Sequence, residues 1–134
     1  MKQHKEILAQ IAVEKSETAL RDACNNIDIS LFVAQNRAYY AIFYIVSALA
    51  YLDGFTTSKH KQLMGWFNKK YIHEEKVFDS SLTKIYSTLM INREKSDYDV
   101  TENPTKEQVL KGIESARIFI EIVKTYILEK LREN

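Results

Sequence analysis

Glycine, proline and cysteine are scarce in this sequence, whose 134 residues include three glycines, one proline and one cysteine. So few glycines and prolines leave little material for tight turns and bounded strands, and long helices are favoured instead. The single Cys24 excludes a framework of internal disulfides and fits a reducing cytosol. The composition therefore predicts a helical, cytoplasmic protein.

Neither strong charge nor a complete membrane-spanning stretch is present. The net charge is +1, so attraction to nucleic acid or to a membrane would need a local patch. The apolar run over residues 31–52 is interrupted at residues 35–37, which leaves about 15 apolar residues in a row, fewer than the ~20 that cross a bilayer. The first ten residues have no apolar signal region. With 46% apolar residues, the chain is expected to fold as a single domain over residues 1–134 outside membranes.

The stretch from Leu31 to Leu52 dominates the sequence, because it contains no glycine or proline and is closed by Asp53-Gly54, a helix-stop dipeptide. A helix that is apolar on all sides must be surrounded by other helices. Arg37 and Tyr40 lie one turn apart within it and share a face.

Four further helices are predicted around this central helix, with Ser30 as its N-cap. They extend from Lys5 to about Asn26, from about Ser58 to about Ile72, from about Ser80 into the nineties, and from about Thr105 to Leu131. The predicted inward residues of the first helix are Ile7, Leu8, Ile11, Ala19, Leu20, Ala23 and Cys24. Those of the third are His60, Leu63, Met64, Phe67 and Tyr71, and those of the fourth are Leu82, Ile85, Tyr86, Leu89 and Met90. The fold class is all-α, a five-helix up-and-down antiparallel bundle around a buried second helix.

A polar set falls on the inward faces of these helices. It consists of Arg37, Tyr40 and His60, with Arg93 and Asp97 continuing the apolar stripe of the fourth helix. One interpretation is structural: Arg93 and Asp97 form an ion pair, and the other groups satisfy one another in the core. The other is functional, because guanidinium groups match phosphate geometry and an imidazole can move protons near neutral pH.

The outer face of the third helix carries lysines and aromatic residues. Lys59, Lys61, Lys69 and Lys70 are interleaved with Trp66 and Tyr71, which could hold a nucleic acid by charge and base stacking. A solvated lysine face with one exposed aromatic ring is the alternative.

Metal and cofactor sites are not predicted. His4, His60 and His73 have no ligand spacing, one cysteine cannot build a zinc site, and Glu-x-x-His motifs are absent from the sequence. There is also no glycine-rich phosphate loop.

Three segments together resemble the HEPN domain family, in its short stand-alone prokaryotic branch. These are residues 36–41 (NRAYYA), residues 58–61 (SKHK), and Arg93 followed by Asp97-Tyr98-Asp99. The resemblance extends over nearly the whole chain. It implies a five-helix bundle that forms homodimers, and often a toxin paired with a minimal nucleotidyltransferase as its antitoxin.

The resemblance also implies metal-independent ribonuclease activity in some branches. In those branches four to six residues separate the arginine of the fourth helix from a following histidine, whereas here residues 98–100 read Tyr-Asp-Val. His60 or Tyr98 could stand in for it, although a free tyrosine with a pKa near 10 is a poor base. In some toxin branches a tyrosine beside the histidine receives a nucleotide from the partner enzyme, which makes Tyr98 a candidate for modification.

Three hypotheses follow. The first is a HEPN-type protein that binds nucleotide or RNA phosphate through Arg37, Arg93 and His60, with Tyr40, Asp97, Tyr98, Lys59 and Lys61 around the ligand. The second is an active ribonuclease with Arg93 and His60 as catalytic residues. The third is a non-catalytic module for dimerisation or interaction. Whether the protein is an enzyme stays open among them.

Overall fold

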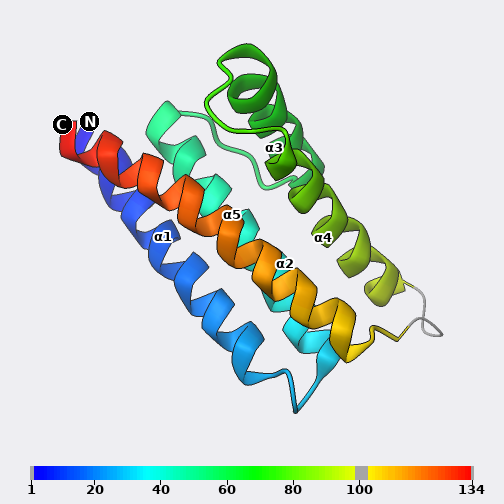
Figure 1. Ribbon diagram of the computed structural model, residues 1–134. Coiled ribbons are helices and arrows are strands. Elements are labelled where there is room, and N and C mark those ends of the chain that lie inside the picture. Colours follow the sequence, from blue (N-terminus) through cyan, green and yellow to red (C-terminus); the bar gives the residue numbers. More distant parts are fainter. Residues whose placement is uncertain (1, 99–102, 134) are drawn as a thin grey trace.

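The chain folds into a bundle of helices in the computed structural model, which describes residues 2–98 and 103–133, apart from the side chains of residues 2, 3 and 98. The helices are α1 (Lys2–Asn25), α2 (Leu31–Asp53), α3 (His60–Phe67), the π-helix η1 (Asn68–Glu74), α4 (Ser81–Tyr98) and α5 (Lys106–Glu133). The long helices lie side by side, α3 sits beside the beginning of α4, and both termini are at one end (Figure 1). The predicted all-α, five-helix bundle is confirmed. Within the described residues, no helix is both long and apolar enough to span a membrane.

Local signals in the sequence explain where the helices begin and end. The Ser30 hydroxyl accepts a hydrogen bond from the Val33 amide at 3.2 Å, as expected of an N-cap. At the end of α2, Gly54 adopts a φ of 75° in the left-handed region, where glycine carries no steric penalty. Helix α5 begins at a reciprocal capping pair, in which the amides of Thr105 and Gln108 each donate to the other residue's side chain.

Helices α1 and α2 pack through small side chains. The buried residues of α1 are Ala9, Ala12, Val13, Ser16, Ala19 and Ala23. The Ser16 hydroxyl donates to the backbone carbonyl of Ala41 at 2.6 Å, so the backbone of α2 lies within reach of a short α1 side chain. Of the predicted inward residues, Ala19 and Ala23 are buried and Leu8 and Leu20 are partly buried, as expected. The inward positions predicted for Ile7, Ile11 and Cys24 are wrong, because all three are exposed. Such a close contact accommodates alanine and serine and leaves the larger side chains outside.

The predicted third helix is divided in two. Helix α3 ends at Phe67 and the wider π-helix η1 continues to Glu74, past the predicted end. Tyr71 is buried and its hydroxyl donates to the Asp53 carboxylate. Trp66 is partly buried and stacks on Phe55 with 5.1 Å between ring centroids. The inward position predicted for Tyr71 is therefore confirmed, and the interpretation in which Trp66 and Tyr71 form an outer aromatic face is wrong.

Helix α2 lies at the centre of the bundle, but one strip of it is only half buried. Ten of its residues are buried against neighbouring helices. Arg37, Tyr40, Tyr44, Ser47 and Tyr51 share the remaining strip at helical spacing and stay partly open to solvent. The strip contains the two polar groups that stand out in the sequence.

Candidate functional site

Arg93 of α4 lies against the tyrosines of α2. Its guanidinium carbon is 4.8 Å from the ring centroid of Tyr39 and 5.8 Å from that of Tyr40, within the range of a cation–π interaction. The side chain is only 15% exposed, and its Nε atom is buried without a hydrogen-bond partner among the described atoms. The aliphatic stripe of α4 thus continues inward to Arg93, where it ends in a charge.

Arg37 reaches the same tyrosine from its own helix. Its guanidinium carbon is 4.8 Å from the Tyr40 ring centroid, and its Nε and Nη2 donate to the Asn36 side-chain oxygen. Two guanidinium groups from different helices therefore contact one aromatic ring. No carboxylate forms an ion pair with Arg37 within the described residues.

His60 is held by aromatic groups of α2. Its Nδ1 lies 2.6 Å from the Tyr39 hydroxyl, and its ring stacks on Phe43 with 4.3 Å between centroids and 15° between planes. The Tyr40 ring approaches it edge-on at 5.5 Å. The first residue of α3 is thereby fixed beside the two tyrosines that contact Arg93.

Burial and the nearby guanidinium set the protonation of this group. Burial, followed by the positive charge of Arg93, lowers the pKa of His60, and Glu94 partly opposes the change. Burial raises the pKa of Tyr39 well above its usual value despite the opposing charge of Arg93. At neutral pH the site therefore combines a neutral imidazole, a protonated phenol and two cations.

Asp97 moderates the charge of the site. Its carboxylate is 3.5 Å from Nη1 of Arg93, one helical turn away, and its side chain is 26% exposed. The ion pair of the structural interpretation is thus present, although neither partner is fully buried. The pair is therefore not sealed from solvent.

Several candidate residues are not part of this arrangement. Lys59 and Lys61 are exposed at the start of α3, beside His60 in sequence. Lys70 forms an ion pair with Asp53 at 2.9 Å. The same carboxylate accepts a hydrogen bond from the hydroxyl of the buried Tyr71, so Lys70 belongs to that contact. The side chain of Tyr98, at the end of α4, and residues 99 and 100 lie outside the described part of the chain.

Tyr39 and Phe43 are missing from the predicted site residues, although they hold His60 and, for Tyr39, Arg93. Their spacing could have indicated a shared role, because Tyr39 and Phe43 are four residues apart and therefore lie on one face of the helix. Both aromatic rings read equally well as plain core residues, and only the position of α3 shows that a histidine lies against them.

Comparison with known proteins identifies the family of this chain. The HEPN domain family model matches residues 8–126. A UPF0332 protein of Thermotoga maritima is 34% identical over 97 residues, covering 72% of this chain and 73% of its own length. Two proteins of Methanocaldococcus jannaschii, named "Putative toxin MJ0142" and "Putative toxin MJ0605", are 30% and 32% identical; the alignments cover 88% and 71% of this chain and 80% and 69% of theirs. The match spans α2, α3 and α4, which together carry the arginine–tyrosine–histidine cluster, and this chain belongs to the HEPN domain family.

Proposed function

We propose that this chain is a toxin-like HEPN protein that binds nucleotide or RNA phosphate between Arg37 and Arg93, in a toxin–antitoxin or stress-defence system. The observation that carries the proposal is the contact of both guanidinium groups with the Tyr40 ring. Guanidinium groups bind phosphate oxygens in a bidentate manner, and an adjacent tyrosine offers a surface for a base. Two relatives with "toxin" in their names support the toxin-like part. The partner in this proposal is a nucleotidyltransferase antitoxin, as the family resemblance implies.

The proposal is tested by titrating a labelled single-stranded RNA with the Arg93→Ala variant and following fluorescence anisotropy. Losing one charge-assisted phosphate contact should weaken binding about tenfold or more. The slope of the logarithm of the binding constant against the logarithm of the salt concentration should fall by the amount expected for about one phosphate contact. Arg117→Ala is the matched control, because Arg117 is an exposed arginine on α5. Unchanged affinity in a folded Arg93→Ala protein would contradict the proposal. If that variant loses thermal stability alone, the cluster is a structural element of an interaction module.

A metal-independent ribonuclease is the second candidate, favoured by the position of His60. Its Nδ1 is fixed by the Tyr39 hydroxyl and its pKa is lowered, so a neutral imidazole with a set orientation lies beside Arg93. In the tautomer with the proton on Nδ1, the ring donates to Tyr39 and its Nε2 can accept a proton. Purified protein should then cleave single-stranded RNA in EDTA, and His60→Gln or Arg93→Ala should abolish the cleavage. Intact RNA after prolonged incubation with partner-free protein would eliminate this candidate.

We further propose a homodimer through the half-buried strip of α2. Tyr40, Tyr44 and Tyr51 present large aromatic rings there, next to the exposed side chains of Phe32 and Val33. Light scattering should give twice the chain mass for the wild type. Tyr44→Glu should give the monomer, because it places a charge in the interface, while Leu128→Glu on the exposed side of α5 should leave the dimer intact. A monomeric wild type at high concentration would refute the dimer.

A further inference from the structure

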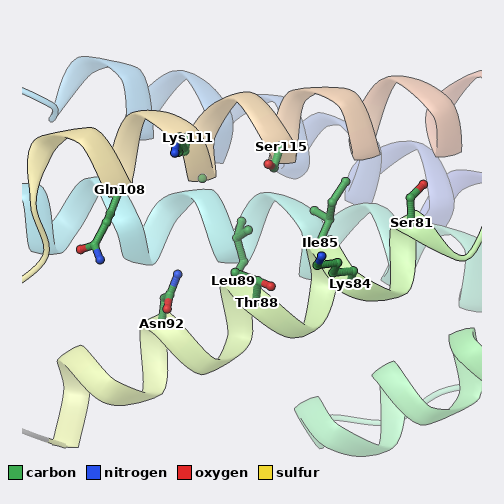
Figure 2. Close-up of a pocket in the computed structure, with 10 residues that line it drawn as sticks. Ser81, Lys84, Ile85, Thr88, Leu89, Asn92, Gln108, Lys111 and Ser115 are labelled. Carbon is green, nitrogen blue, oxygen red and sulfur yellow. The ribbon is translucent and has the colours of Figure 1, made fainter.

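A groove between α4 and α5 is separate from the arginine–tyrosine–histidine cluster. It has a volume of about 380 Å³. In Figure 2, Asn92 and Gln108 extend from the two helices into the space at one end, and Leu89 projects toward α5. Arg93 is the neighbour of Asn92, but its guanidinium group is directed to the tyrosines of α2. The two sites therefore use different sides of α4.

Gly112 keeps this groove open. It lies within α5, and a Cβ atom added there would meet no other atom within 4 Å. Glycine inside a helix is less favourable than alanine, and nothing in the packing requires it at this position. A larger side chain at residue 112 would fill the groove without a collision at its first carbon.

The groove combines an apolar floor with a cationic rim. Ile85 and Leu89 of α4 supply apolar surface, while Lys84 and Lys111 contribute one ammonium group from each helix. No Asp or Glu lines the groove, and neither lysine forms an ion pair within the described residues. The complementary ligand has an apolar side chain flanked by carboxylates.

The apolar surface continues beyond the groove along α5. Ile118 and Ile122 follow Lys111 and Ser115 at steps of three and four residues, which places them on the same face. They are 45% and 42% exposed. Two exposed isoleucines in line with the groove fit a ligand as extended as a protein segment. No aromatic ring lines the groove, so the stacking surface that single-stranded RNA uses is lacking there.

We propose that the α4–α5 groove is the docking site for an acidic amphipathic segment of a partner protein. The segment places an apolar side chain over Gly112, between Ile85 and Leu89, and directs its carboxylates to Lys84 and Lys111. Its next apolar residues cover Ile118 and Ile122. This is the helix-in-groove mode of recognition, and it is independent of the proposed phosphate site.

The experiment titrates the full chain into a fluorescein-labelled synthetic helical peptide of about 16 residues, with leucines three and four apart and glutamates between them. The glutamate peptide should bind at least about tenfold more tightly than the same peptide with glutamines. Gly112→Leu should weaken binding at least about tenfold, since its side chain occupies the groove. Gly65→Leu is the matched control: residue 65 also lies in a helix with open space around it, and its substitution should leave affinity unchanged.

Several results would overturn the proposal. These are no binding of the glutamate peptide at about 1 mM, equal binding of the glutamine peptide, or full affinity of folded Gly112→Leu. Loss of RNA affinity in Gly112→Leu would make the groove an RNA site, and loss of a concentration-dependent dimer would make it a contact between copies. Should Gly112→Leu not fold, Lys84→Glu combined with Lys111→Glu decides the matter: it must lose the glutamate peptide and gain a lysine-substituted one.

Discussion

The two sides of α2 are built from different kinds of residue. Toward α1, the helix presents alanines, among them Ala41, whose carbonyl accepts the Ser16 hydroxyl. Toward α3 and α4 it presents Tyr39, with Phe43 and the edge of Tyr40 beside it, and these rings contact His60 and Arg93. One helix thus forms a close backbone contact on one side and a mixed aromatic and charged cluster on the other.

The difference teaches how a polar site is kept inside a small bundle. Small residues let α1 approach α2 closely, which secures α2 in the core. Large rings separate α2 from its other neighbours and create room for a guanidinium group and an imidazole, each of which finds an aromatic face. The alanine side therefore supplies rigidity, while the tyrosine side supplies the environment in which the charged groups are tolerated.

The largest effect is expected from Tyr39→Ala. Tyr39 is fully buried and contacts both His60 and Arg93, so removing the ring leaves a cavity and two polar groups without their partner. The free energy of unfolding should fall by about 3–5 kcal/mol, measured by urea denaturation. Tyr39→Phe retains the ring and loses only the hydroxyl, so it should lose about 0.5–1.5 kcal/mol. Equal losses in the two variants would show that the hydroxyl, and not the ring, supports the cluster.

A smaller loss is expected when the alanine side is enlarged. Ala41→Leu forces a longer side chain into the contact with α1 and should lower the free energy of unfolding by about 1–3 kcal/mol. Gln10→Leu is the control, because residue 10 of α1 is exposed and should accept leucine with little change. A stable Ala41→Leu protein would mean that α1 and α2 are not in close contact.

The smallest effect concerns pH. The pKa of His60 is lowered in the folded state, so below the unfolded pKa of about 6.5 the unfolded chain binds more protons than the folded one. Stability from this group is therefore complete above about pH 6.5 and is lost as the pH falls below that value. The melting temperature of His60→Gln should decline less than that of the wild type between about pH 7.5 and about pH 5. The same decline in both proteins would show that His60 is not the group that titrates.

Much of the fold and part of the cluster could be predicted from residue patterns. The caps at Ser30 and Gly54 mark the limits of α2, and the aliphatic stripe of α4 leads directly to Arg93. The face of α1 was predicted only in part: Ala19 and Ala23 are buried as expected, but Ile7 and Ile11 are exposed. That helix carries both an isoleucine stripe and an alanine stripe, and only the close approach of α2 decides which one is buried. The break at Phe67 was also not predicted, because no glycine or proline between residues 66 and 74 marks the change from α-helix to π-helix.

The sequence by itself determined the helices, their order and most of their limits, the break at Phe67 excepted, because periodicity and capping act between residues close in the chain. It also determined which charges belong to inward faces. Only the tertiary structure decided that His60 meets Tyr39, that Arg93 meets the same tyrosine from another helix, and that Gly112 opens a groove. These contacts join residues far apart in the sequence, and their geometry depends on how closely side chains of different size let the helices approach.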